Sequence, residues 1–372
     1  MFYRDLAGIN VSALGYGCMR FPTKDGHIDE AEAQALLLRA YEGGVNYFDT
    51  AYNYHGMESE PFVGRVLGTL SRDSFHVATK FPSWKPESLE DAKGIFEFQL
   101  KNLRSDYVDF YLIHALNGAR WEKVNKLDLI PLFEEYQRQG RIRKLGFSFH
   151  GGYAEFEEIL RARKWDFCQL QFNYMDTQDQ AGEKGFLLAE ELGVGVVVME
   201  PVKGGALAAL PEDVAFPFRT LAPEASDALW ALRFVADYGN AKVVLSGMSS
   251  RAQLEDNLAT FAAHRPLNAA EKQAVAQVAE ALARRTNNSC TGCRYCMPCP
   301  NGVNIPHMFS IWNEYARYQN GAASRGDYLF TSADSRADKC VACGACVPMC
   351  PQGIDILGDL KKMASEAWTR EK

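Results

Sequence analysis

The feature that most constrains the fold is an alternation of strand-like and helix-like segments that repeats eight times. Apolar runs of strand character fall near residues 14–19, 46–49, 76–80, 108–114, 144–148, 167–172, 195–199 and 243–246. Segments with apolar residues at helical spacing fall near 30–42, 59–70, 88–103, 128–139, 153–162, 184–192, 225–237 and 251–263. Eight repeats favour a closed parallel α/β barrel, a (β/α)8 TIM barrel, over an open doubly wound sheet. We expect a hairpin over residues 2–12 ahead of the first strand.

Length and charge limit what else the chain can be. Its 372 residues suit one barrel plus an appendage, and 47% apolar with 23% charged residues is typical of a globular protein. The net charge of −7 without a basic block argues against nucleic acid or anionic membrane as a partner. No apolar run approaches the roughly 20 residues that span a bilayer, so no membrane span is expected. The N-terminus lacks the basic and apolar regions of a signal peptide.

Reactive side chains stand at the ends of three successive predicted strands. Asp49 and Tyr54 follow the second strand, Lys80 ends the third and His114 ends the fourth. Carboxyl ends of parallel strands meet at one face of a barrel. A tyrosine can be a general acid near neutral pH if a cation such as Lys80 lowers its pKa, while a carboxylate holds the ammonium and His114 orients a carbonyl or shares the proton. Asp49 and Lys80 alone would also fit a buried structural ion pair.

In this order the four residues resemble the catalytic tetrad of the aldo-keto reductases, which place Asp, Tyr, Lys and His at these strand ends. The spacing of five between Asp49 and Tyr54 also matches. The resemblance covers about residues 1–265. It implies an oxidoreductase that interconverts a small-molecule carbonyl and an alcohol with NADP or NAD, and in which Tyr54 is the general acid and base.

The remaining strand ends indicate a cofactor cleft. The resemblance implies that Ser148 and Gln169 hold the nicotinamide carboxamide. A glycine-containing turn with a lysine, Lys203 and Gly204, suits a pyrophosphate, because backbone N–H groups can approach it closely. The segment after the eighth strand matches the family's adenosine segment, with Asn257 as the expected adenine contact. Its candidate residues are Ser246, Gly247, Arg251, Gln253 and Asn257.

Three positions depart from the family pattern. Met199 stands where the family usually has a tyrosine that stacks on the nicotinamide, and a methionine can still pack against a ring. Gly247 and Gln253 stand where the family often has a lysine and an arginine that pair with the 2′-phosphate of NADP. Arg251 is a candidate to replace the lost charge. The departures leave the choice between NADP and NAD open.

Eight of the ten cysteines form two runs near the C-terminus. The runs are Cys290-x2-Cys293-x2-Cys296-x2-Cys299-Pro and Cys340-x2-Cys343-x2-Cys346-x3-Cys350-Pro. This is ligand spacing rather than a disulfide framework, so we expect a reducing, cytoplasmic location. Three cysteines two residues apart can wrap one cubane, and a fourth before proline can reach the other cluster.

These runs resemble the bacterial two-cluster ferredoxins over about residues 287–357. The resemblance implies two 4Fe–4S clusters with exchanged ligands, one on Cys290, Cys293, Cys296 and Cys350, the other on Cys340, Cys343, Cys346 and Cys299. Zinc ribbons also use paired C-x2-C motifs, although rarely with eight cysteines ending twice in Cys-Pro. We expect an aldo-keto-reductase-like barrel over residues 1–286 and a ferredoxin-like iron–sulfur domain over 287–372.

Two functions follow from the sequence. The first is the carbonyl–alcohol oxidoreductase with NADP or NAD. The second is an iron–sulfur redox enzyme or electron-transfer module, in which the clusters deliver electrons to or from a redox partner protein and the barrel holds a substrate or partner. Nicotinamide transfers two electrons at once and a cubane transfers one, so coupling them normally needs a flavin or another group that splits the electron pair. The sequence does not identify the substrate. It also does not decide whether the clusters are structural or carry electrons.

Overall fold

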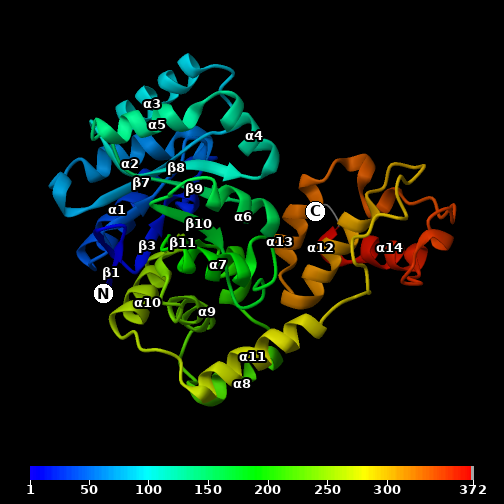
Figure 1. The fold of residues 1–372 in the computed structure, drawn as a ribbon. Coiled ribbons are helices and arrows are strands. Elements are labelled where there is room, and N and C mark those ends of the chain that lie inside the picture. The colour runs from blue at the N-terminus through cyan, green and yellow to red at the C-terminus, as the bar shows by residue number, and fades with distance from the viewer. Residues whose placement is uncertain (370–372) are drawn as a thin grey trace. The chain divides into compact units, whose positions relative to one another are not determined.

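The protein forms two compact units in a computed structural model that describes residues 1–369 (Figure 1). The first unit comprises Met1–Ala208 and Glu224–Lys272, and the second comprises Ala209–Pro223 and Gln273–Lys372. The segment around residue 215 joins the second unit, where Asp213 pairs with Arg285 at 2.7 Å. The domain border between residues 286 and 287 stays a prediction.

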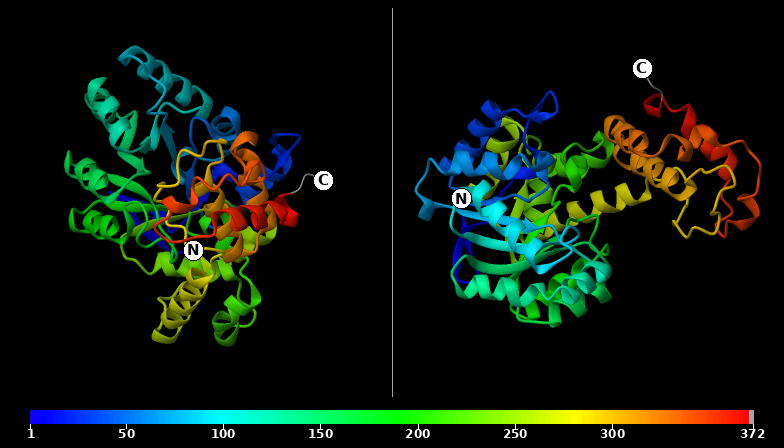
Figure 2. Two further views of the ribbon diagram at one scale, coloured as in Figure 1. Left: turned by 90° about the vertical axis from the view of Figure 1, so that its right-hand side faces the viewer. Right: turned by 90° about the horizontal axis from the view of Figure 1, so that it is seen from above.

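The first unit is a closed barrel of eight parallel strands, which confirms the predicted fold class (Figures 1 and 2). Each strand pairs in parallel with the next, and the last strand pairs with the first through Ser246 and Tyr16. The strands are β3 (Leu14–Gly17), β6 (Tyr47–Asp49), β7 (His76–Phe81), β8 (Val108–Leu116), β9 (Ile142–Phe149), β10 (Phe167–Gln171), β11 (Gly195–Met199) and β12 (Ala241–Ser246).

All eight predicted barrel helices are present, with ends within a few residues of those expected. They are α1 (Glu30–Glu42), α2 (Ser59–Leu67), α3 (Leu89–Leu103), α5 (Leu129–Arg138), α6 (Tyr153–Arg161), α7 (Gly182–Glu191), α9 (Asp227–Ala236) and α10 (Arg251–Ala262). Short polar side chains begin several of them, as where Ser88 accepts a hydrogen bond from the Asp91 N–H. The loop after β8 contains an additional helix that was not predicted, α4 (Gly118–Lys126).

Apolar residues fill the barrel in two layers. Side chains between strands and helices form the larger core, and a second core lies inside the barrel around Tyr47, Phe110 and Phe167. The expected hairpin, β1 (Tyr3–Leu6) with β2 (Ile9–Ser12), is confirmed. Its buried Leu6 and Val11 belong to the inner core, so the hairpin closes the amino-terminal end of the barrel. A second small hairpin joins β4 (Thr23–Lys24) to β5 (His27–Ile28).

The second unit is built from helices and cysteine-bearing loops. The sequence also indicates helices over residues 267–285, which are alanine-rich, and over 307–317, between the cysteine runs. The structure has α11 (Ala269–Arg284), which begins in the first unit, and α12 (Ile305–Tyr318) at these places. Three further helices were not predicted: α8 (Glu212–Leu221), α13 (Gly321–Phe330) and α14 (Ile356–Ser365). A core of its own contains Phe309, Trp312 and Met363, against which most of the cysteines pack.

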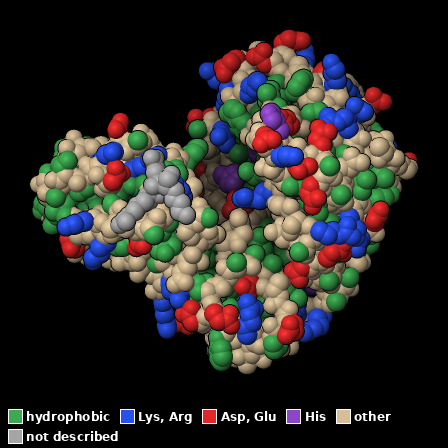
Figure 3. Space-filling model, turned by 180° about the vertical axis from the view of Figure 1, so that it is seen from behind, with side chains coloured by type: hydrophobic (Ala, Val, Ile, Leu, Met, Phe, Trp, Pro, Cys, Tyr) green, Lys and Arg blue, Asp and Glu red, His purple; other side chains and the backbone are tan. Residues whose placement is uncertain are grey.

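Charges of both signs are interspersed over the face drawn in Figure 3. None of the helices within residues 1–369 is both long and apolar enough to cross a bilayer.

Candidate active site and iron–sulfur centre

The alternation of side chains along each strand positions the candidate catalytic residues. Tyr47 and Leu112 point into the inner apolar core. Successive inward positions of a strand are two residues apart, so Asp49 and His114 are the next inward side chains toward the carboxyl end. Lys80 follows Ala78 of β7 in the same way. The parallel strands therefore bring these side chains together directly above the apolar layer.

Lys80 joins the predicted tetrad. Its Nζ donates to Asp49 Oδ1 at 2.5 Å, to the Thr50 carbonyl oxygen at 2.8 Å and to Tyr54 Oη at 3.2 Å. These three bonds use every proton of the ammonium, and the residue is only 1% exposed. The rings of Tyr54 and His114 lie edge to face with centroids 6.1 Å apart. All four predicted residues thus lie in one site.

Burial sets the protonation states in this site. Burial raises the pKa of Tyr54 and Lys80 lowers it, but burial is the larger effect and the net pKa lies above the usual value of 10. The tyrosine therefore stays protonated at neutral pH, whereas the sequence suggested a lowered pKa. Burial disfavours the Lys80 ammonium, yet the Asp49 carboxylate and the hydrogen bonds to Asp49 and Tyr54 outweigh it, so the pKa of Lys80 is raised.

His114 is neutral in this environment. Burial is the main cause that holds its pKa well below 6.5, and the positive charge of Lys80 adds to it. Its Nδ1 is buried and has no hydrogen-bond partner within residues 1–369. The Trp84 ring lies 5.2 Å from the histidine ring, and the Arg120 guanidinium lies 5.2 Å from that tryptophan. A neutral imidazole beside a protonated phenol can orient a substrate oxygen without carrying charge.

Gln169 and Ser148 offer groups that suit a carboxamide. The Oε1 atom of Gln169 is buried and has no partner in the part of the chain that the structure describes, so it can accept from an amide N–H. Ser148 Oγ accepts from the Ala115 N–H at 2.7 Å and keeps its own hydroxyl proton for another acceptor. Met199 ends β11 and packs against the inner core. These groups fit a nicotinamide.

In the turn after β11, Lys203 and two backbone N–H groups have partners within the protein, and the pyrophosphate site there stays a prediction. Lys203 donates to both carboxylate oxygens of the buried Asp176 at 2.8 Å. The backbone N–H groups of Lys203 and Gly205 bond to the carbonyl oxygens of Glu200 and Val202. These donors are therefore occupied within the protein itself, and Asp176 was not singled out from the sequence.

The adenosine segment also satisfies most of its own polar groups. Arg251 Nε donates to Glu255 at 2.6 Å, and Arg39 binds the same carboxylate at 2.8 and 2.9 Å. Asn257 is buried and donates to Ser246 Oγ at 2.9 Å. The Gln253 side chain accepts from the Ser249 N–H at 2.8 Å. Arg251 is thus paired, rather than free to bind a phosphate.

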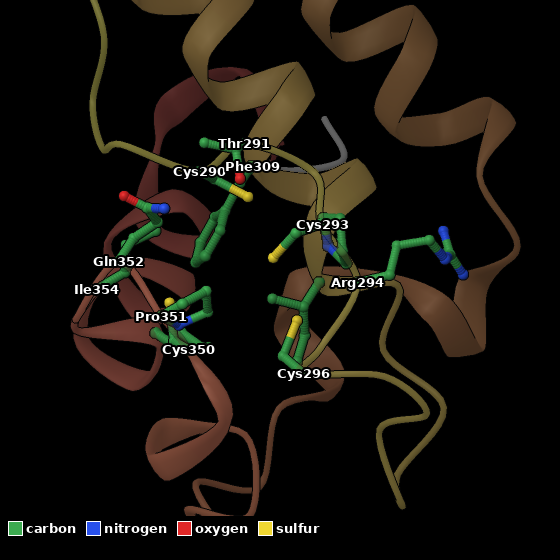
Figure 4. A pocket seen from close by; sticks show the side chains of 13 residues that line it. Cys290, Thr291, Cys293, Arg294, Cys296, Phe309, Cys350, Pro351, Gln352 and Ile354 are labelled. Atoms are coloured by element: carbon green, nitrogen blue, oxygen red, sulfur yellow. The ribbon is translucent and has the colours of Figure 1, made fainter.

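The cysteines of the second unit surround a cavity. Figure 4 shows Cys290, Cys293, Cys296 and Cys350 around this cavity, and Phe309 also lines it. The cysteine from the second run therefore meets three from the first. Cys346 in turn lies within electrostatic range of Cys340 and Cys299, and also of Cys296.

The arrangement fits a cluster better than a single ion. Within residues 1–369, no three Cys, His, Asp or Glu side chains converge closely enough to hold one metal ion. Four thiols around a cavity match the ligand set of a cubane, which is much larger than one zinc ion. All ten cysteines are free of disulfides.

Two family profiles match the chain. The profile of the Aldo/keto reductase family matches residues 13–280, and that of a 4Fe-4S dicluster domain matches residues 289–354. The first match covers most of the chain and describes a family of oxidoreductases, and the second places an iron–sulfur domain after it. The chain belongs to the aldo/keto reductase family.

Individual proteins agree with this assignment. Probable aldo-keto reductase 1 of Glycine max is 29% identical over 208 residues, 53% of this chain and 58% of that protein. The NADH-specific methylglyoxal reductase of Escherichia coli (strain K12) is 25% identical over 226 residues, 54% of this chain and 64% of that one. The chain spans about half the length of the first curated relatives it matches, 58% and 46%. The solved structure of the aldo-keto reductase AKR11C1 from Bacillus halodurans (holo form) has a TM-score of 0.63 at 28% identity, covering 75% of this chain and 96% of that one.

Proposed function

We propose that the protein reduces a small-molecule carbonyl to an alcohol, or catalyses the reverse, with NAD(H) or NADP(H). The observation that carries the proposal is the hydrogen-bonded arrangement of Lys80 between Asp49 and Tyr54 at the carboxyl end of the barrel. A structural ion pair alone would not need the Tyr54 phenol on Lys80 or the neutral His114 ring, whose centroid lies 6.1 Å from that of the phenol.

The residues of the barrel take separate roles. Ser148, Gln169 and Met199 would hold a nicotinamide, which would supply or accept the hydride. Tyr54 donates its proton to the carbonyl oxygen during reduction, and the ammonium of Lys80 stabilises the phenolate that remains. Asp49 keeps that ammonium charged and in place, since their atoms are 2.5 Å apart. His114 orients the substrate oxygen through a neutral ring nitrogen.

We propose NAD(H) as the preferred cofactor. Arg251, the candidate for a 2′-phosphate contact, is already bound to Glu255, which also binds Arg39. A 2′-phosphate beside Glu255 would meet a carboxylate, and like charges repel. The relative from Escherichia coli is named an NADH-specific methylglyoxal reductase, which agrees with this choice.

Anaerobic titration tests the proposal. NADH is added to the purified protein while binding heat is measured, and turnover is then assayed with a panel of small aldehydes and ketones. Saturable binding with carbonyl-dependent NADH oxidation is expected. A protein that binds neither NADH nor NADPH would contradict the proposal.

We also propose two 4Fe–4S clusters in the second unit, with ligands exchanged between the two cysteine runs. The cavity bounded by Cys290, Cys293, Cys296 and Cys350 supports the first set, and the proximity of Cys346 to Cys340 and Cys299 supports the second. Cys343 would complete it. Bound thiolates and free cysteines both suit a reducing cytoplasm.

A second function, electron transfer with a protein partner, has one observation in its favour. Cys293 and Cys343 are exposed, and beside them Tyr295 and Val341 are 65% and 64% exposed. An apolar rim around an accessible cluster gives a redox protein a surface to contact. Reduction of the clusters by a reduced low-potential ferredoxin, without any nicotinamide present, would support this function.

A further inference from the structure

Arg20 lies between two glycines that belong to the proposed cofactor site. It ends the short helix η1 (Cys18–Arg20) after β3, where its carbonyl oxygen accepts from Ser249 Oγ at 2.7 Å. A Cβ built on Gly247 would lie 2.9 Å from Arg20 Cβ and 3.3 Å from its Cγ and Cδ. A Cβ built on Gly204 would lie 3.4 Å from Arg20 Nη2. The side chain therefore runs along Gly247 and its guanidinium reaches the turn after β11.

The neighbouring cations are bound to carboxylates, and Arg20 is not. Lys203 is held by Asp176, and Arg251 by Glu255. Arg20 is exposed, and among residues 1–369 its guanidinium forms no ion pair or side-chain hydrogen bond. An unpaired guanidinium at this end of the barrel remains available for an anion.

Gly247 explains how Arg20 can lie here. The family often has a lysine where Gly247 stands, and any side chain at that position would occupy the space of the Arg20 stem. Gly247 therefore has two linked effects. It removes the cation that a lysine would supply there, and it leaves room for the cation of Arg20, which follows the neighbouring strand of the barrel. Gly204 and Gly205, with φ of 63° and 103°, place no side chain over the guanidinium.

We propose that Arg20 binds the diphosphate of the dinucleotide cofactor. This inference rests on the proposed function. The planar guanidinium matches a phosphate with two parallel hydrogen bonds, which a lysine cannot form. The diphosphate would then lie along the turn at Gly204, where Arg20 supplies the charge that Lys203 shares with Asp176.

A series of ligands and variants tests the assignment by binding alone. Isothermal titration of the intact protein uses NADH, ADP, adenosine 2′-monophosphate and adenosine. The variants are Arg20→Leu, Arg20→Lys and, as a control, Arg65→Leu, which removes an arginine that pairs with Glu30 on the outer helices. Losing hydrogen bonds to a charged group should weaken NADH and ADP about ten- to a hundredfold in Arg20→Leu.

The other ligands sharpen the result. Adenosine and adenosine 2′-monophosphate should bind equally to the wild-type protein and Arg20→Leu, and Arg20→Lys should recover part of the affinity for ADP. If Arg20→Leu binds ADP and NADH as tightly as Arg65→Leu does, the inference is wrong while the proposed function stands. A loss confined to adenosine 2′-monophosphate would likewise overturn it. Wild-type protein that binds no dinucleotide would overturn both.

Discussion

The two units of the molecule prepare their reactive groups in opposite ways. In the barrel, Lys80 is buried with all three of its protons bonded before any ligand arrives. In the second unit, Cys293 and Cys343 are exposed on loops, and four thiols surround a cavity without meeting at a point. The barrel therefore fixes its geometry with its own hydrogen bonds, whereas the proposed clusters would fix the geometry of the cysteine loops.

The largest expected effect concerns the barrel, where hydrogen bonds within the protein fix the site. Tyr54→Phe should lower kcat for carbonyl reduction about a hundred- to ten-thousandfold, because the proton donor is lost while the ring remains. Steady-state kinetics measures the loss, and NADH titration should show unchanged affinity. Tyr41→Phe, which removes a hydroxyl bonded to Ser74 on the outside of the barrel, is the control. Near-normal turnover in Tyr54→Phe would remove that residue from the mechanism.

The next effect concerns the cysteine loops of the second unit and the clusters proposed for them. The reconstituted protein should contain about eight irons, four for each cubane, and Cys350→Ser should lose about half of them. Cys296→Ser should lose the same cluster, leaving the same electron paramagnetic resonance signal, whereas Cys346→Ser should lose the other. NADH binding should survive in all three, because the barrel has its own core. Stoichiometric zinc, or different residual signals in Cys350→Ser and Cys296→Ser, would contradict the assignment.

The pH dependence of the reduction rate tests whether His114 and Tyr54 have the shifted pKa values of buried groups. His114 has a lowered pKa and is neutral above its usual value of 6.5, while Tyr54 has a raised pKa and is protonated through neutral pH. The rate of reduction should therefore be flat between about pH 6 and 8 and fall only at alkaline pH as the phenol ionises. Pre-steady-state rates across this range provide the measurement. An inflection near pH 6.5 that disappears in His114→Gln would show that the histidine titrates instead.

The smallest effect concerns cofactor choice. Glu255→Gln should release Arg251 and remove the repelling charge, so affinity for NADPH should rise about two- to fivefold relative to NADH. Competitive titration of the two dinucleotides measures the ratio. Glu280→Gln, which breaks a similar pair with Arg284 on α11, is the matched control and should leave the ratio unchanged. An equal change in both variants would mean that the net charge of the protein alone decides the ratio of NADPH to NADH affinity.

Sequence patterns predicted the barrel because each strand and helix is local and the pattern repeats. The tetrad followed because Asp49, Lys80 and His114 each end a recognisable strand. Arg20 could not be found this way, because its position depends on Gly204 and Gly247, which become its neighbours only when the barrel closes. Its place directly after the first strand was the available signal.

Two of the helices that were missed, α8 and α13, have sequences that weaken helix formation. Pro217 lies inside α8, and α13 contains Gly321 and Gly326. In α13 the Asn320 side chain accepts from the Ala323 N–H, and Tyr328 packs into the core of the second unit. Packing and capping thus outweigh poor intrinsic propensity there. The net pKa of Tyr54 could not be predicted from the sequence either, since it depends on how deeply the phenol is buried.

The hairpin of β1 and β2 has a kinetic consequence. Because Leu6 and Val11 fill the amino-terminal end of the barrel, the proposed cofactor and its substrate would both enter and leave through the opposite end. Two ligands that share one entrance obstruct each other unless the deeper one arrives first and departs last. Turnover should therefore follow a compulsory order of addition, and product inhibition patterns would reveal which ligand is the first to bind.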